Sequence, residues 1–318
     1  MYLGIDLGGT KIAAGLVDDN GRILKDRRIL THRSRPCREV IKDMILIGNT
    51  LIEDCAPESV IAAGIGAPGL VDTEKGVLIN SVNLGWKNTP IASMLREGIG
   101  VPVYAGNDAT LAGIAEMEAG VLRGVKCGVM LTLGTGVGSA VICEGRIQYG
   151  ANNVASEIGH MIVGSNFYRC SCGRNGCLET FASATALIRY AKRLLKAGEP
   201  SVLGQMCPNG NIDSISGIMI FNAAQEGDAV AAKAVDRVAR YLGIGISNVI
   251  AVLDPEKIVL GGGMSKAGDF LLDKVKNEVE RIRFYKDIPS GEIVFARFGN
   301  EAGIIGAAML ARQRIEEE

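Results

Sequence analysis

The chain has 318 residues, and its 34 lysines and arginines nearly balance 35 aspartates and glutamates, for a formal net charge of −1. That balance argues against nucleic acid or a membrane surface as the main partner, since both attract a basic excess. Glycine is abundant, with 42 residues, but it follows no G-x-y period and Pro is only 9, which excludes collagen. We expect a globular chain of one large domain or two medium ones.

In chain order we predict strands at 2–7, 12–17 and 22–30, a helix at 41–55, a strand at 60–65, a helix at 89–97, a strand at 101–105 and a helix at 107–119. There follow strands at 128–133, 138–143 and 145–148, a loop at 150–177, helices at 183–197, 214–226 and 228–253, a strand at 257–261, a helix at 265–282, a strand at 292–296 and a helix at 301–315. Strands that alternate with helices indicate an α/β fold.

Two stretches more than a hundred residues apart share one pattern. Residues 4–23 and 130–147 both read as a strand, a Gly/Thr turn, a second strand and a turn ending in Gly-Arg-Ile. Any two hairpins could share this pattern of strands and turns, but the repeat favours two lobes with the same topology. We predict an N-terminal lobe over 1–118, a C-terminal lobe over 119–301 containing the loop 150–180, and a last helix, 302–318, that packs back on the first lobe.

The first residues, MYLGIDLGGTK, lack the cationic start and apolar core of a signal peptide, and no stretch approaches 18 uninterrupted apolar residues. We therefore expect a cytoplasmic protein without a membrane span. Eight cysteines in a chain of this size are not a disulfide framework of the small secreted type. Three of them crowd into eight residues, and that cluster needs its own explanation.

Three glycine segments follow predicted strands, where backbone N–H groups could face phosphate oxygens without obstruction from side chains. Each could alone be a tight hairpin or a strand end, but together they favour nucleotide binding. Asp6 could also hold Mg²⁺ through water. The segments are Asp6-Leu7-Gly8-Gly9-Thr10-Lys11, Gly134-Thr135-Gly136-Val137-Gly138 and Gly261-Gly262-Gly263.

Two better-known nucleotide motifs are rejected. The chain contains no G-x-x-x-x-G-K-[ST] and is therefore no P-loop protein. Residues 64–69, GIGAPG, match the dinucleotide fingerprint, but neither an amphipathic helix nor a suitably spaced acidic residue follows. We interpret GAPG as a rigid loop.

One histidine and three cysteines form a spacing typical of a metal site. His160 is followed, within one short segment, by Cys170, Cys172 and Cys177. Three thiolates and one imidazole complete a tetrahedral zinc site, and a closed set of ligands indicates a structural role. The alternative is three reduced thiols in a loop. Zinc is favoured because a loop with few apolar residues needs another means of holding its shape.

Taken together, these motifs resemble the ROK family of sugar kinases and repressors, most closely its glucokinase-like members. The resemblance runs in order through nearly the whole chain. It is carried by DLGGTK (6–11), GAPG (66–69), NDA (107–109), LGTGVG (133–138), EIGH (157–160), CSCGRNGCLE (170–179) and the GIIGAA of the last helix. It implies a two-lobed, actin-like and hexokinase-type α/β fold (ribonuclease-H-like) with the active site in the interlobe cleft.

The resemblance also implies an ATP-dependent hexose kinase that uses MgATP, acts on glucose and is a homodimer with structural Zn²⁺. Asp108 would be the catalytic base, which fits a reaction that needs one carboxylate to accept the hydroxyl proton. The phosphate contacts would come from Asp6 to Lys11 and from Leu133 to Gly138, and Gly261 to Gly263 would face adenosine. The implied sugar ligands are Gly69, Asn83, Asn107, Asp108, Glu157, His160 and Glu179.

Residues 150–157, GANNVASE, depart from the pattern of glucokinase-like members, which usually carry glycine at the positions of Asn153 and Ser156. Both residues precede Glu157, so the choice of hexose stays open among glucose, N-acetylmannosamine, N-acetylglucosamine and fructose. A second class, the sugar-responsive repressor, is disfavoured because the DLGGT strand begins at residue 2 and the net charge is −1. A non-catalytic sugar-binding regulator is disfavoured because Asp108 and both phosphate loops are present. Asn107 and Asp108 also suit the start of a helix, a role compatible with catalysis.

Overall fold

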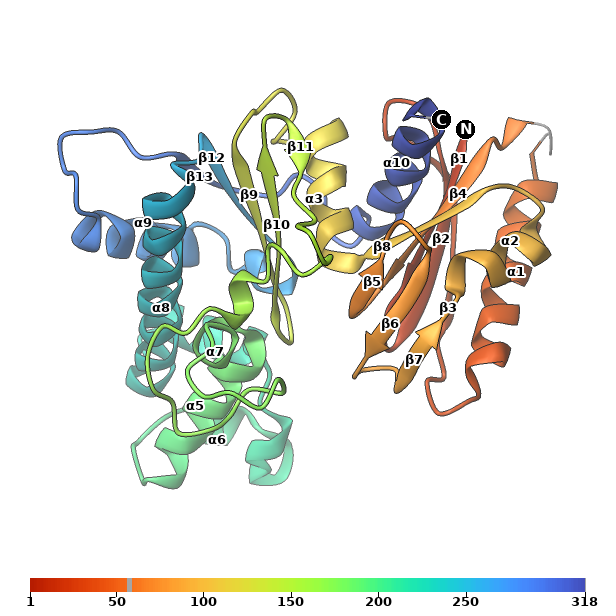
Figure 1. Ribbon diagram of the computed structural model, residues 1–318. Coiled ribbons are helices and arrows are strands. Elements are labelled where there is room, and N and C mark those ends of the chain that lie inside the picture. Colours follow the sequence, from red (N-terminus) through yellow and green to blue (C-terminus); the bar gives the residue numbers. More distant parts are fainter. Residues whose placement is uncertain (56–58, 318) are drawn as a thin grey trace. The chain divides into compact units, whose positions relative to one another are not determined.

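Two five-stranded sheets with the same strand order organise the chain, which confirms the α/β prediction (Figure 1). The computed structural model describes residues 1–55 and 59–317. The first sheet has the order β3-β2-β1-β4-β8, made of Ile23–Leu30, Lys11–Val17, Tyr2–Leu7, Ala62–Ala67 and Val103–Asn107. The second has the order β11-β10-β9-β12-β13, made of Arg146–Ile147, Val137–Cys143, Gly128–Leu133, Lys257–Gly261 and Glu292–Phe295.

The chain divides into two compact units, each assembled from separate segments. Unit 1 comprises Met1–Lys126, Ala140–Ser156 and Arg297–Glu318, and unit 2 comprises Cys127–Ser139 and Glu157–Ala296. The helices of unit 1 are α1 (Cys37–Glu53), α2 (Ile91–Ile99), α3 (Asp108–Ala119) and α10 (Ala302–Glu317). Those of unit 2 are α4 (Glu179–Ala182), α5 (Ala184–Lys196), α6 (Leu203–Met206), α7 (Gly217–Gln225), α8 (Ala229–Leu253) and α9 (Asp269–Ile282).

Helices cover both faces of the first sheet. Alternate residues of β1 point to opposite sides and therefore meet different helices. Leu3 points toward α1, where a Cβ on Gly48 would lie 3.1 Å from its side chain. Gly4 points toward α10, where its own Cβ would lie only 2.0 Å from the carbonyl oxygen of Ile304. The core of unit 1 consists of the apolar side chains on these two faces. Its fully buried members include Leu3, Ile5, Met44 and Ile65.

Close contact between α10 and the sheet depends on glycine. Gly4 and Gly64 are paired on the neighbouring strands β1 and β4, and a Cβ on Gly64 would lie 1.8 Å from the carbonyl oxygen of Ala307. On the helix, a Cβ on Gly306 would lie 1.9 Å from the carbonyl oxygen of Leu111 in α3. Backbone therefore packs directly on backbone around α10.

Replacing Gly64 with alanine is expected to destabilise the protein by about 3 kcal/mol or more, which is the upper end of the usual range for overpacking. The obstacle is a main-chain carbonyl, which cannot move without shifting α10. Gly204→Ala is the matched control, since an added Cβ there meets nothing within 4 Å. Denaturant unfolding should separate the two variants, and equal midpoints would show that α10 can move away at little cost.

Three short strands were not predicted. β5 (Leu70–Asp72), β6 (Val77–Ser81) and β7 (Trp86–Thr89) form a small antiparallel sheet in unit 1. Since β5, and not a helix, follows the GAPG segment, the structure agrees with the rejection of a dinucleotide-binding turn. Among the described residues, no helix is both long and apolar enough to span a bilayer.

Candidate active site and metal centre

In unit 1, sheet register brings together residues far apart in sequence. β1, β4 and β8 are parallel, with Asp6 opposite Gly66 and Ala67 opposite Asn107. The carboxyl ends of the three strands therefore meet at one edge, where ligands bind in α/β sheets. Asp6 lies near the end of β1, and Asp108 begins α3 directly after β8. Two carboxylates predicted to act on MgATP and on the hydroxyl thus share this edge.

Asn107 orients the start of α3. Its Oδ1 accepts hydrogen bonds from the N–H groups of Ala109 (2.9 Å) and Thr110 (3.1 Å), which is the geometry of a helix N-cap. Its Nδ2 donates to the carbonyl oxygen of Gly69 at 3.0 Å, and so ties the GAPG loop to α3. Asn107 has one amide hydrogen left for a ligand. Asp108 Oδ1 itself accepts from the N–H of Ala109 at 2.9 Å.

Burial raises the pKa of Asp6 to about 6, with a smaller contribution from the nearby negative charge of Asp108. α10 encloses the same carboxyl group, since a Cβ on Gly303 would lie 2.6 Å from its Oδ2. A carboxylate held away from water beside a second carboxylate is unfavourable when ionised. A bound cation would relieve that cost, so the electrostatics of the edge suit a metal-bound phosphate ligand.

This pKa shift predicts a pH dependence of stability. Because the folded-state pKa lies above the unfolded value near 3.9, the folded chain binds more protons, and stability falls as pH rises from about 4 to about 6. Asp6→Asn should remove this loss and raise the free energy of unfolding of the ligand-free protein at pH 7–8 by about 3 kcal/mol.

The control for this prediction is Asp72→Asn. Hydrogen bonds from the backbone N–H of Lys75, the larger contribution, and from its side chain hold the pKa of Asp72 below its usual value. Replacement of Asp72 should therefore not stabilise the protein at neutral pH. Urea unfolding of both variants from pH 4 to pH 8 provides the measurement. Parallel pH profiles for wild type and Asp6→Asn would contradict the assignment.

Hydrogen bonds from residues outside each turn hold the backbone of the two predicted phosphate turns. In unit 1, the Thr31 hydroxyl donates to the carbonyl oxygen of Gly8 at 2.6 Å, and the Thr31 N–H donates to that of Thr10 at 2.9 Å. In unit 2, the N–H of Ala184 and the hydroxyl of Thr185 donate to the carbonyl oxygens of Gly134 (2.8 Å) and Thr135 (2.7 Å).

Space remains open over both turns. A Cβ on Gly9 or on Gly134 would meet nothing within 4 Å, so the backbone at these two glycines is accessible to a ligand. The third glycine segment reaches the second turn: β12 pairs in parallel with β9, and a Cβ on Gly262 would lie 2.6 Å from the carbonyl oxygen of Leu133. Unit 2 therefore joins two of the three predicted nucleotide segments.

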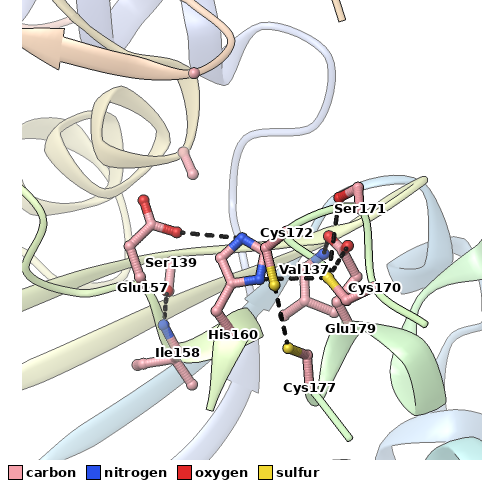
Figure 2. A network of polar contacts seen from close by, with 12 residues as sticks. Val137, Ser139, Glu157, Ile158, His160, Cys170, Ser171, Cys172, Cys177 and Glu179 are labelled. Atoms are coloured by element: carbon pink, nitrogen blue, oxygen red, sulfur yellow. Dashed lines mark hydrogen bonds and ion pairs between the residues drawn. The ribbon is translucent and has the colours of Figure 1, made fainter. Parts of the chain in front are cut away.

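The predicted metal ligands converge in unit 2 (Figure 2). The ligand atoms of His160, Cys170, Cys172 and Cys177 all lie within 4.8 Å of one another. Cys170 Sγ is 3.6 Å from His160 Nδ1, and Cys172 Sγ is 3.6 Å from Cys177 Sγ. Ligand atoms of a tetrahedral zinc site lie about 3.5–3.8 Å apart, given Zn–S and Zn–N bonds of about 2.3 and 2.0–2.1 Å. The arrangement could therefore hold a zinc ion.

Ionisation of all three thiols is unfavourable in the absence of a cation. Burial raises the pKa of Cys170 and, with the neighbouring thiols, raises that of Cys177 to about 12. Burial also opposes ionisation of Cys172, but hydrogen bonds from Arg174 and from the other thiols outweigh it and lower its pKa to about 6. A metal ion would supply the charge that three adjacent thiolates require. The donor set thus fits a structural metal by its chemistry as well as by its spacing.

Two carboxylates flank the cluster and link it to the rest of the site (Figure 2). Glu157 Oε2 lies 3.9 Å from His160 Nε2, on the side of the ring away from the thiols. Glu179 Oε2 accepts from the N–H of Val137 at 3.2 Å, while its Oε1 lies 3.5 Å from Cys170 Sγ. Glu179 therefore contacts both the second phosphate turn and the metal cluster.

Residues that hold the loop before the cysteines were not predicted. Asn166 Oδ1 accepts from Arg237 Nη2 at 2.9 Å, and the guanidinium of Arg237 stands 4.6 Å from the Tyr190 ring and 4.8 Å from the Phe181 ring. Tyr168 donates its hydroxyl to the carbonyl oxygen of Thr180 at 2.7 Å, next to Glu179. The contacts of Arg237 join α8 to a loop far from it in sequence, which no local pattern reveals.

The two departures from the glucokinase-like pattern have a common backbone feature. Asn153 and Ser156 both adopt positive φ, at 55° and 66°, the left-handed region where glycine is free of strain. Each side chain is hydrogen-bonded: Thr73 Oγ1 donates to Asn153 Oδ1 at 3.0 Å, and Ser156 Oγ donates to the carbonyl oxygen of Gln148 at 3.1 Å. The segment before Glu157 therefore keeps a glycine-type conformation without glycine. Asn83, the remaining predicted ligand, is exposed between β6 and β7.

Known proteins resemble the chain over its length. It is 35% identical to the glucokinase of Halalkalibacterium halodurans, over 98% of this chain and 95% of that protein. It is 31% identical to the xylose repressor of Caldicellulosiruptor bescii, over 79% of this chain and 62% of that protein. A crystal structure of a ROK family glucokinase from Streptomyces griseus, in complex with glucose and AMPPNP, superposes with a TM-score of 0.85 at 34% identity and covers 98% of this chain and 99% of that one.

This likeness confirms the predicted two-lobed, actin-like and hexokinase-type fold. The family match itself spans residues 2–314, and so includes the glycine turns, the NDA segment, the Cys/His cluster and nearly all of α10. With such a match, and with a glucokinase that is similar over nearly its full length, the chain belongs to the ROK family.

Proposed function

We propose that this protein is an ATP-dependent hexose kinase that converts glucose to glucose 6-phosphate. Full-length similarity to glucokinases supports the reaction class. The observation that carries the chemistry is the shared edge of β1 and β8, where Asp108 begins α3 and its charge acts on Asp6. Phosphoryl transfer needs one carboxylate for the hydroxyl proton and groups that bind the phosphates. Asp108 and the two glycine turns would supply them.

In this proposal Asp108 accepts the proton of the glucose 6-hydroxyl as that oxygen attacks the γ-phosphorus, and ADP leaves. The Asn107 N-cap places Asp108 at the first position of α3, and the N–H of Ala109 donates to its carboxylate. The base would therefore lose little freedom when it acts. The backbone of 8–11 and 133–138 would bind phosphate oxygens, and Gly261 to Gly263 would face adenosine. Asp6 would hold Mg²⁺ through water, and Mg²⁺ would neutralise phosphate charge.

The proposed sugar ligands are polar groups. They are Gly69, Asn83, Asn107, Asp108, Glu157, His160 and Glu179. A hexose has many hydroxyls and little apolar surface, so carboxylates, amides and imidazole suit its recognition. Zinc bound by His160 and the three cysteines would hold Glu157 and Glu179 in place through the contacts described above. Its role would be structural, since four protein ligands leave no open position.

A coupled ADP-release assay over a hexose panel tests the proposal. Glucose should give the highest kcat/KM, with N-acetylmannosamine, N-acetylglucosamine and fructose as the alternatives. A repressor-type regulator would instead bind a sugar, measured by calorimetry, without releasing ADP. Absence of turnover on every hexose would refute the kinase. We further propose that the protein works in the cytoplasm, where MgATP is available, and as a homodimer, which light scattering can check.

A further inference from the structure

A polar hollow in unit 1 lies outside the proposed reaction site. Its volume is about 480 Å³, and it is formed by the β2–β3 turn, the segment after α3 and the segment before α10. The three segments are in direct contact, because a Cβ on Gly21 would lie 2.6 Å from Ala119 Cβ and 3.5 Å from Ile305 Cγ2. Separate parts of the chain thus form one pocket.

Positive charge dominates this hollow. Arg22, Arg123 and Arg297 line it, one from each segment, against the single carboxylate of Glu301. Within residues 1–55 and 59–317, none of the three guanidiniums forms an ion pair, whereas Arg312 on the adjacent α10 pairs with Glu118. The nearby Asp18 carboxylate already accepts the backbone N–H groups of Asn20 and Arg22, at 3.0 and 2.9 Å.

One of the arginines is held in place. Arg297 Nη1 donates to the carbonyl oxygen of Ala119 at 3.0 Å, and its guanidinium stands 5.5 Å from the centre of the Phe298 ring. This anchoring leaves its other N–H groups for a ligand. The half-buried ring of Phe298 adds an apolar face to the hollow. Guanidinium groups match the oxygens of phosphate in bidentate geometry, which favours phosphate over chloride.

We propose that this hollow, the arginine pocket, binds a phosphate dianion, either free or as the phosphate group of a small organic molecule. The dianion would lie among Arg22, Arg123 and Arg297, and the body of an organic ligand would lie against Phe298. A sugar phosphate, a nucleotide monophosphate and free phosphate share this chemistry.

The arginine pocket is separate from the proposed base. The N–H of Phe298 donates to Glu116 Oε1 at 2.8 Å, and Glu116 lies two turns along α3 from Asp108, or about 12 Å of helix. Ligand binding at Arg297 would therefore act on the far end of the helix that carries Asp108, and it would not occupy the reaction site.

Calorimetric titration at constant ionic strength tests the proposal with three probes: inorganic phosphate, glucose 6-phosphate and AMP. The variants are Arg22→Gln, Arg123→Gln, Arg297→Gln and the triple variant. Arg28→Gln is the control, an exposed arginine of β3 that pairs with Asp26. Each pocket variant should weaken one binding event at least tenfold, or about 1.4 kcal/mol, and the triple variant should lose it. The control should bind as wild type does.

The probes identify the source of the phosphate. Tighter binding of glucose 6-phosphate or of AMP than of inorganic phosphate would assign the body of the ligand, and equal binding would assign phosphate alone. Any binding at the reaction site persists in the triple variant and cancels in the comparison. Identical titrations of wild type and triple variant, or displacement of every probe by equimolar chloride, would overturn the proposal. The readout is binding, so the result does not depend on whether the kinase assay succeeds.

Discussion

Replacement of Asp108 by asparagine is expected to lower kcat for glucose phosphorylation by about 10²–10⁴-fold, the usual contribution of a positioned general base. Glucose affinity should stay nearly unchanged, because asparagine keeps the shape of the side chain and an oxygen that can accept the N–H of Ala109. The same change removes a negative charge that raises the pKa of Asp6. The pH dependence of stability between about 4 and 6 should therefore become smaller.

Steady-state kinetics and glucose calorimetry on one preparation separate these effects. Asp72→Asn is the control, since it removes a carboxylate of the same unit that pairs with Lys75 at the surface, and its kcat should equal that of wild type. A near-normal kcat for Asp108→Asn would remove this residue from the role of base. A large loss of glucose affinity with intact kcat would assign it to sugar binding alone.

The second large effect is expected at the metal centre. Protein purified without added zinc should contain about one zinc per chain, and Cys172→Ser should reduce that content well below one. The thermal midpoint should fall by about 5 °C or more, because the loss of several kcal/mol of metal binding removes folding free energy. Phosphorylation should weaken as well, since Glu179 contacts both Cys170 and Val137 of the phosphate turn.

Cys143→Ser controls for the loss of a thiol as such, because Cys143 lies in β10, outside the cluster. Its zinc content and thermal midpoint should match those of wild type. A chelator should lower the midpoint of wild type and of Cys143→Ser, but it should have little effect on Cys172→Ser. If wild-type protein contains no metal and the chelator does not change its thermal midpoint, the cluster consists of three reduced thiols and is not a zinc site.

Local patterns were sufficient for most of the fold. The strands at 2–7 and 12–17 were predicted because apolar runs border a glycine turn, and the helix predicted at 107–119 is α3, shorter by one residue. β5, β6 and β7 were missed because strands of three to five residues show too little alternation. The helix predicted at 265–282 is interrupted at Gly268, whose φ of 62° separates a 3₁₀ turn from α9.

The candidate site divides in the same way. The metal cluster was predictable because its ligands all fall within the short segment 160–177. Asp6 and Asp108 are far apart in sequence, and the register of β1, β4 and β8 accounts for their electrostatic contact. For Asn153 and Ser156, the sequence revealed the departure but not its structural explanation. The missing glycines were visible in the sequence, but the positive φ that explains them, and the hydrogen bonds to Thr73 and Gln148 that accompany it, were not.

Unit 1 is built from segments on both sides of unit 2, and this has a consequence for synthesis of the chain. α10 packs on Gly4 and Gly64, yet residues 127–296 must be translated before it appears. At about 5–20 residues per second this takes roughly 10–30 s. For that interval a nascent chain exposes the α10-facing side of β1 and β4, which makes this surface the place where a chaperone would protect the new protein from aggregation.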